Sequence, residues 1–234
     1  MNNTILERLK EERAMRLKGC LYHYTQINFA YNTNRIEGSQ LTEDETRYIY
    51  EAHTISTGDN KTINVNDIIE SVNHFSCFDY LLKVAEEPLS EEIIKNFHSI
   101  LKRGTTDSYK DWFKIGDYKT RENYVNDLKT ALPSEVNDKI HELLLIYTKE
   151  EIDFNRIVDF HYKFEMIHPF QDGNGRVGRL IMFKECLKNN IIPFIIEDKN
   201  KQFYYMGLKE YPNSKIHLID TCLFSQDIYK EVIE

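Results

Sequence analysis

HPFQDGNGRVGR, residues 168–179, is the stretch of this 234-residue chain from which the fold can be worked out. Pro169 disfavours helical geometry at the residue before it, so an amphipathic helix over residues 154–167 should end at His168. Three of the nine glycines of the chain lie within a few residues of one another here, which favours a tight turn. A new helix should begin near Gly175. The sequence therefore predicts two helices joined by a glycine-rich loop.

The side chains of this loop are groups that phosphate chemistry uses. His168 is a candidate base, because an ordinary imidazole pKa of about 6.5 suits proton abstraction near neutral pH. Asp172 offers hard oxygen atoms to a metal ion. Arg176 and Arg179 are three residues apart, so both can reach one side of a first helical turn that itself favours anions. Each feature alone has a common structural explanation, but together they predict phosphoryl-type transfer.

The rest of the chain predicts an all-α, mainly helical domain with one small β-hairpin. Residues 105–130 lose the helical period, and the aromatic stretch 112–125 predicts a hairpin or extended flap. A loop at residues 53–62 is the best internal boundary, which divides the chain into an N-terminal helical segment, 1–60, and a core, 61–234. Apolar residues at helical spacing and capping patterns predict helices at 4–17, 22–37, 65–85, 90–101, 154–167, 175–189, 199–210 and 214–232. Two further helices should begin after a Thr42–Glu45 capping box and at residue 133.

Composition limits the classes of function. With 38 acidic and 30 basic residues the net charge is −8, which argues against binding to nucleic acid or to an anionic membrane, although a local cationic pocket could still bind a nucleotide. No apolar run approaches the roughly 20 residues of a membrane span, and the first residues lack the apolar centre of a signal peptide. The four scattered cysteines indicate reduced thiols. We expect a cytoplasmic protein with no nucleic acid and no membrane as partner.

The loop matches every specified position of HPFx(D/E)GNGRxxR, the signature of the Fic (filamentation induced by cAMP) family, which the chain resembles over most of its length. The resemblance implies the Fic fold and transfer of AMP from ATP to a hydroxyl side chain of a target protein or of the enzyme itself. The stretch 112–125 resembles the flap at which the family docks its targets. The family commonly has arginine after the aromatic residue of that flap, whereas this chain has Lys119 after Tyr118.

The resemblance also implies a role for each residue of the loop. His168 would be the catalytic base, and Asp172 would hold Mg²⁺ on the α- and β-phosphates. Arg176 would bind the phosphate chain and Arg179 the γ-phosphate, so that attack occurs in line at the α-phosphorus and pyrophosphate leaves. The α-phosphate would lie against Gly173, Asn174 and Gly175, and the aromatic pair Tyr204 and Tyr205 would form the adenine pocket.

Residues 33–38, TNRIEG, resemble the inhibitory motif [S/T]xxxE[G/N] of Fic proteins in which the inhibitory helix precedes the core. A carboxylate of Glu37 paired with Arg179 would keep that guanidinium from the γ-phosphate. Such a pair is strong and geometrically specific when water is largely excluded. The resemblance therefore implies an enzyme that inhibits itself in the free state.

Two alternatives remain open at the level of sequence. One is a different reaction at the same site, such as removal of AMP from a modified protein or transfer from another nucleotide or phosphoryl donor. Gly175 favours nucleotidyl transfer, because phosphotransferase relatives usually carry lysine there. The other is a catalytically silent interaction module, against which the complete loop argues. The sequence does not name the target protein, and it does not decide whether the chain forms a homodimer, as many family members do.

Overall fold

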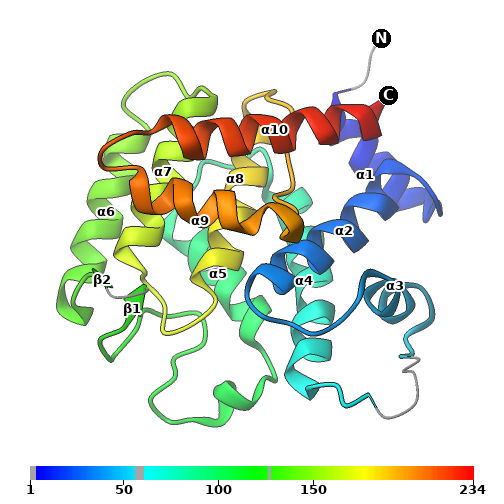
Figure 1. The fold of residues 1–234 in the computed structure, drawn as a ribbon, viewed down its shortest axis with the longest axis horizontal. Helices are drawn as coiled ribbons and strands as arrows, with labels where there is room; N and C mark the ends of the chain where they lie inside the picture. The colour runs from blue at the N-terminus through cyan, green and yellow to red at the C-terminus, as the bar shows by residue number, and fades with distance from the viewer. Residues whose placement is uncertain (1–3, 56–60, 126–127) are drawn as a thin grey trace.

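The computed structural model describes residues 4–55, 61–125 and 128–234, and these form a bundle of helices around one central helix (Figure 1). The α-helices are α1 (Ile5–Met15), α2 (Leu21–Ile36), α3 (Glu43–Ala52), α4 (Val65–Val84), α5 (Glu91–Lys102), α6 (Val136–Tyr147), α7 (Phe154–Ile167), α8 (Asn174–Lys188), α9 (Lys201–Glu210) and α10 (Ile216–Ile233). Short 3₁₀ turns cover Thr106–Tyr109, Pro133–Glu135 and Asp198–Asn200, and two short strands are β1 (Tyr124–Val125) and β2 (Leu128–Lys129).

The helix boundaries follow from local sequence signals. Thr42 begins α3 with the predicted capping box: its hydroxyl accepts from the amide of Glu45, whose carboxylate accepts from the amide of Thr42. The hydroxyl of Ser90 accepts from the amide of Ile93 at the start of α5. His168 ends α7 in the left-handed region, with φ 52°, just before the proline that cannot continue the helix. The predicted helical architecture is confirmed, with helix ends shifted by a residue or two.

α8 is the central helix. Its side chains from Asn174 to Leu187 are all buried, and it packs against α2, α4, α5 and α7. Two charged residues of its first turns, Arg176 and Arg179, are each only 3% exposed. Buried guanidinium groups must be paired with acceptors. The surroundings of α8 therefore decide what these arginines can bind.

The segment before residue 60 shares one hydrophobic cluster with the rest of the described chain. Phe29 of α2 contacts Phe78 of α4 and Phe183 of α8, with ring centroids 6.2 and 5.2 Å apart. The predicted boundary loop, 53–62, includes residues 56–60, which lie outside the described residues. The division into 1–60 and 61–234 stays a prediction, but α2 packs as part of the same core as α8.

The hairpin predicted over residues 112–125 is wrong. Residues 112–123 form turns and bends, and β pairing within the described residues is confined to β1 and β2, which are antiparallel and lie at the end of this stretch. The backbone of the stretch has other partners: the amide of Gly116, for example, donates to Nδ1 of His98 at 2.9 Å. A backbone group engaged by a core side chain is not available for a strand ladder.

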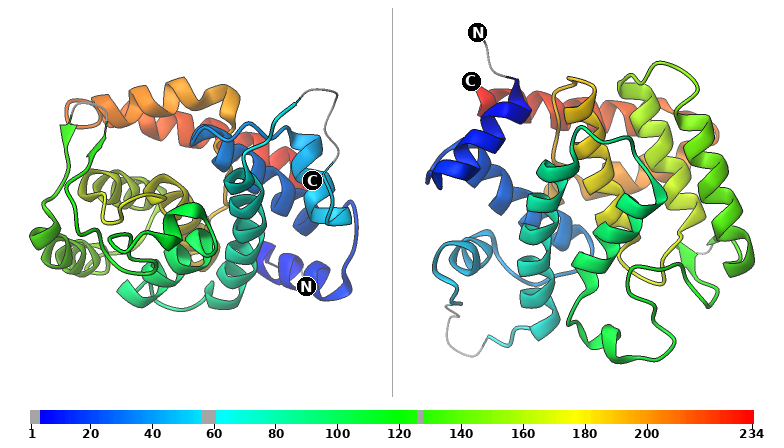
Figure 2. Two further views of the ribbon diagram at one scale, coloured as in Figure 1. Left: turned by 90° about the horizontal axis from the view of Figure 1, so that it is seen from below. Right: turned by 180° about the vertical axis from the view of Figure 1, so that it is seen from behind.

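The two ends of the described chain, α1 and the end of α10, lie close together (Figure 1 and the right view of Figure 2). Nη1 of Arg8 on α1 donates to the carbonyl of Ile233 at the end of α10, at 2.7 Å. Among the described residues, no helix is both long enough and apolar enough to cross a membrane.

Candidate active site

His168 lies just past α7 with 19% of its side chain exposed. Its Nδ1 is 3.3 Å from the carbonyl oxygen of Glu165, so an Nδ1–H tautomer donates there and leaves Nε2 as an acceptor. Burial lowers the pKa of His168 to about 4, and the nearby ammonium of Lys119 acts in the same direction. The imidazole is therefore neutral at pH 7, which is the state that a general base requires.

Residues 118–123 hold the loop from outside. The amide of Lys119 donates to the carbonyl of Pro169 at 2.8 Å, and Nδ2 of Asn123 donates to the carbonyl of Phe170 at 2.9 Å. The ammonium of Lys119 is buried and donates to Oδ1 of Asn123 at 2.6 Å. Burial lowers the pKa of this ammonium to about 8. Lys119 thus connects residues 112–125, the expected docking flap, with the loop that carries His168.

Asn174 closes the loop from inside. The amide of Phe170 donates to its Oδ1, and its Nδ2 donates to the carbonyl of the same residue, both at 2.8 Å. The side chain is 1% exposed, and the contact predicted between it and the α-phosphate stays a prediction. The first amides of α8, including that of Gly175, have no partner within the helix and can still bind an anion.

Glu37, at the end of α2, reaches this N-terminus of α8. Its Oε1 accepts from Nη2 of Arg179 at 2.6 Å, and a Cβ added to Gly175 would collide with the same oxygen. The absence of a Cβ at residue 175 thus leaves room for this carboxylate directly against the backbone. That carboxylate occupies the space in which a helix N-terminus favours an anion.

Thr33 completes the contacts of Arg179. Its hydroxyl accepts from Nε at 2.6 Å and its carbonyl accepts from Nη2 at 3.2 Å. Burial opposes the charge on Arg179, but Glu37 more than compensates and raises its pKa. The first and fifth residues of the stretch 33–38 therefore hold the same guanidinium, and Gly38 ends the stretch in the left-handed region with φ 100°.

Arg176 contacts a different pair of carboxylates. Its Nη1 bonds to Glu70 of α4, and its Nη2 lies 3.3 Å from Oδ2 of Asp172. Lys102, at the end of α5, bonds to the same two residues, with Nζ 2.6 Å from Oε1 of Glu70 and 2.5 Å from Oδ2 of Asp172. Burial opposes the charge on Asp172, but Arg176 and Lys102 hold its pKa well below the usual range. The two arginines of the loop are thus brought together on one helical turn but bind separate carboxylates.

Three residues near the loop were not found from the sequence: Glu70, Lys102 and Glu165. Lys102 lies four residues after His98, so both side chains are on one face of α5. Two polar residues on that buried helix face are the pattern by which the sequence could have indicated Lys102. Glu165 is 5% exposed, and burial raises its pKa to about 8 against the opposing effect of Arg179. Glu70 lies on α4 without any local pattern that marks it.

Tyr204 and Tyr205 lie in different surroundings. Tyr204 is 1% exposed, and its hydroxyl is 2.7 Å from Nε2 of the fully buried His161. Tyr205 is 39% exposed, and its hydroxyl donates to the carbonyl of Ile36 at 2.9 Å, next to Glu37. The predicted contact of either tyrosine with adenine stays a prediction, and Tyr205 has the more accessible ring.

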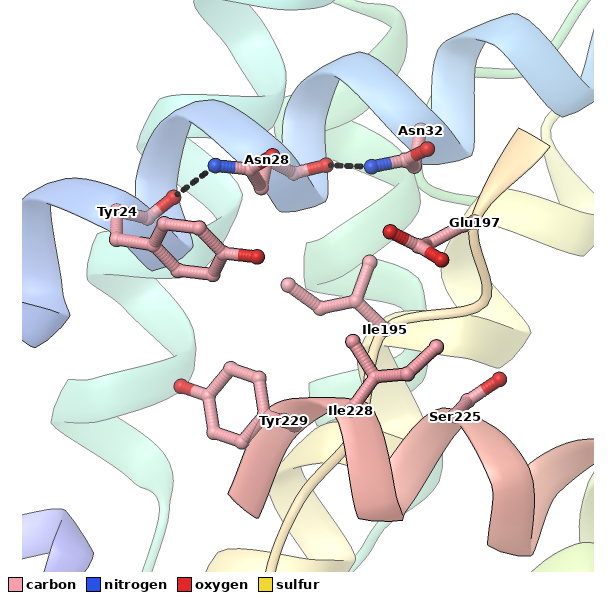
Figure 3. A pocket seen from close by; sticks show the side chains of 8 residues that line it. All are labelled: Tyr24, Asn28, Asn32, Ile195, Glu197, Ser225, Ile228 and Tyr229. Carbon is pink, nitrogen blue, oxygen red and sulfur yellow. Dashed lines mark hydrogen bonds between the residues drawn. The ribbon is translucent and has the colours of Figure 1, made fainter. Parts of the chain in front are cut away.

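The small pocket in Figure 3 lies between α2, residues 195–197 and α10, and no residue of the loop lines it. Its volume of about 10 Å³ has room for a single water molecule, which excludes a nucleotide. In the part of the chain that the structure describes, no three His, Cys, Asp or Glu residues are grouped so as to hold a metal ion.

Residues 88–186 match the model of the Fic/DOC family. The chain is 25% identical over 196 residues to protein adenylyltransferase Fic of Nematostella vectensis and 27% identical over 191 residues to protein adenylyltransferase fic-1 of Caenorhabditis elegans. These alignments cover 80% and 79% of this chain but only 42% and 36% of the relatives, so the chain spans less than half of their length.

Two solved structures have a similar fold. A Fic domain containing signaling protein from Bacteroides thetaiotaomicron superposes with a TM-score of 0.77 at 22% identity, over 97% of this chain and 90% of that one. Fic-1 from C. elegans superposes with a TM-score of 0.76 at 20% identity, over 97% of this chain and 69% of that one. At these identities the likeness shows the fold alone.

Proposed function

This chain carries a Fic domain at residues 88–186, and from that premise we propose that it transfers AMP from ATP to a hydroxyl side chain of a target protein or of itself. One observation carries the proposal: a neutral, accessible imidazole at the end of α7 shares its loop with the amides and arginines at the start of α8. This pairing of a base with an anion site is what nucleotidyl transfer requires.

In the proposed reaction the oxygen of the target hydroxyl forms a bond to the α-phosphorus of ATP. The hydroxyl proton passes to Nε2 of His168, the bond from the α-phosphorus to the bridging oxygen of the β-phosphate breaks, and pyrophosphate leaves with that electron pair. The carbonyl of Glu165 holds Nδ1 and so keeps Nε2 free. A pKa of about 4 makes His168 a weak base in the free protein. The negative charge of a bound nucleotide would raise that pKa toward neutrality.

Mg²⁺ fits this site as an ion held mainly by the nucleotide. Asp172 offers one carboxylate with 44% of its side chain exposed, although its Oδ2 is engaged by Lys102. Magnesium usually keeps several waters and takes one or two carboxylates together with substrate phosphates. The ion would neutralise charge on the phosphates and on the departing pyrophosphate. Phosphate contacts of the chain itself would come from the first amides of α8, from Arg176 and from Arg179.

We propose further that Glu37 inhibits the free enzyme. Its carboxylate pairs with Arg179 and lies over Gly175, so it competes with a phosphate for the same guanidinium and the same amides. ATP could bind beside Glu37 only with its α-phosphate out of line with the attacking hydroxyl. Displacement of this one side chain would then open the site.

Intact-mass analysis after incubation with Mg-ATP tests the activity. We expect an adenylyl adduct on the Glu37→Gly variant, or on an added target, in much larger amount than on the wild type. His168→Ala in the Glu37→Gly background is expected to abolish the adduct while ATP binding survives, because only the base is lost. Uridylyl or phosphoryl adducts with other donors would reassign the reaction, and equal labelling without His168 would remove it from the mechanism.

We propose that the target docks near residues 112–125, the segment that ends in β1. Strand addition at an exposed edge reads backbone shape more than side chains, so it suits an extended target segment. The Arg121 guanidinium lies 4.3 Å from the Trp112 ring on this surface. Trp112→Ala should lower modification of an added target more than it lowers nucleotide binding, and equal losses of both would reject docking at this segment.

A further inference from the structure

Lys102 is the most enclosed cation at the loop. It lies at the end of α5 with 2% of its side chain exposed, and its Nζ contacts Oε1 of Glu70 at 2.6 Å and Oδ2 of Asp172 at 2.5 Å. A third carboxylate, that of Asp107, is 3.6 Å away. An ammonium has three donors and no acceptor, and two of these donors bond to Glu70 and Asp172.

The stem of this lysine is fixed as well as its head. Its Cδ would lie 3.6 Å from a Cβ added to Gly173, so the side chain passes directly beneath the loop. Glu70 holds it from the other side and bonds to Arg176 at the same time. Lys102 is therefore held beside Asp172 by a carboxylate that also binds α8 through Arg176.

The negative charges around Asp172 are matched by cations of the chain itself. Lys102 and Arg176 contact Glu70 and Asp172, and the neighbouring Asp107 is paired with Lys110, which makes three positive and three negative groups. Among the described residues no cluster of three or more metal-ligating side chains exists to attract a divalent cation. A second positive ion beside this ammonium would be repelled, and the repulsion is strong where water is scarce.

We propose that Lys102 is the resident counter-ion of Asp172: it keeps divalent cations off this carboxylate in the free protein, so that the metal enters only together with the phosphates of a nucleotide. Only the second part of this proposal, the entry of the metal together with a nucleotide, rests on the proposed function. A nucleotide brings both the remaining ligands and the negative charge that offset the repulsion. Lys102 is thus a positioning residue that sets the order of binding.

Titration of the nucleotide-free protein with Mn²⁺, followed by the electron paramagnetic resonance signal of the free ion, tests the first half. We expect negligible binding to the wild type and an affinity for Mn²⁺ raised by about tenfold or more in Lys102→Met, because one buried positive charge is removed. Lys110→Met is the matched control, because it removes an exposed positive charge that pairs with the nearby Asp107. It should leave the affinity for Mn²⁺ unchanged. Lys102→Met/Asp172→Asn should lose the gained affinity.

Lys102→Gln keeps a donor for Asp172 without the charge, and it replaces Lys102→Met if that variant does not fold. Equal Mn²⁺ binding by the wild type and both Lys102 variants, or a gain that survives Asp172→Asn, would overturn the proposal. A second titration with a non-hydrolysable ATP analogue separates the two claims. Binding of Mn²⁺ to the wild type should then appear only with the nucleotide. Failure of that step alone would count against the proposed function and leave the role of Lys102 in the free protein standing.

Discussion

Two clusters of charged residues hold the first turns of α8, and they differ in how they can come apart. The latch cluster consists of Thr33, Glu37 and Arg179, and the scaffold cluster of Glu70, Lys102, Asp172 and Arg176. In the latch, one carboxylate that is 26% exposed faces one guanidinium. In the scaffold, two cations that are 2% and 4% exposed share two carboxylates. A phosphate can replace the carboxylate of the latch, whereas loss of a scaffold carboxylate leaves two buried cations to share the remaining one.

The difference is sharpest in the free energy of unfolding. Glu70→Ala removes the acceptor that Lys102 and Arg176 share, so we expect a loss of about 3–5 kcal/mol, the usual cost of breaking a buried ion pair on one side. Glu37→Ala should cost clearly less, because Arg179 keeps both oxygen acceptors of Thr33. Urea denaturation of both variants measures this. Equal losses would mean that the two clusters do not differ in kind.

A buried histidine beneath both clusters makes stability depend on pH. Burial lowers the pKa of His74 to about 3, Arg179 and Arg176 add to the effect, and neither ring nitrogen has a hydrogen-bond partner among the described residues. The pKa of His74 is lower in the folded protein than its unfolded value of 6.5. The contribution of the neutral imidazole to the free energy of unfolding is therefore complete above pH 6.5 and is lost as the pH falls toward 3. The slope is about 1.4 kcal/mol per pH unit for one proton.

His74→Leu should therefore reduce the pH dependence of the unfolding free energy by about one proton between pH 6 and 4. The residual dependence includes His98 and His161, whose pKa values burial also lowers to about 3, His168, and carboxyl groups with shifted pKa values such as Asp172 and Glu165. Denaturant unfolding at several pH values measures the slope. A slope that His74→Leu leaves unchanged would show that this imidazole is protonated in the fold or does not stay buried.

The smallest effect concerns the support of the latch. Tyr205→Phe removes the hydrogen bond to the carbonyl of Ile36, next to Glu37, which is worth about 1 kcal/mol or less at this half-buried position. We expect AMP transfer to rise by about twofold, because the latch opens more often. Tyr211→Phe removes a similar bond to Asp159 away from the latch and is the matched control. Equal rates in both variants would detach Tyr205 from the inhibition.

The contrast between the clusters also explains what could be predicted from the sequence. The end of α7 at His168 followed from the helix-stopping proline, whereas Glu37 and its pairing with Arg179 followed from the resemblance of two short motifs, 33–38 and 168–179, to those of a known family. The scaffold joins residues from α4, α5 and α8, and only the packing of those helices brings Glu70 and Lys102 to Asp172. The hairpin failed for the same reason, because the backbone of residues 112–123 is fixed by distant core and loop groups. The motif also did not indicate that the side chain of Asn174 bonds to the backbone of Phe170 within the same loop.

The central claim is that the space over Gly175, beside Arg179, is an anion site which Glu37 fills. Calorimetric titration with Mg-ATP of the wild type, Glu37→Gln and Glu37→Gly tests it most directly, with thermal unfolding as a check on the fold. The account predicts the weakest binding for the wild type, and an affinity for Glu37→Gly that is higher by about tenfold or more, because the carboxylate that competes for Arg179 is removed. Glu37→Gln should lie between them. The same dissociation constant for all three folded proteins, or no saturable heat in any, would contradict it.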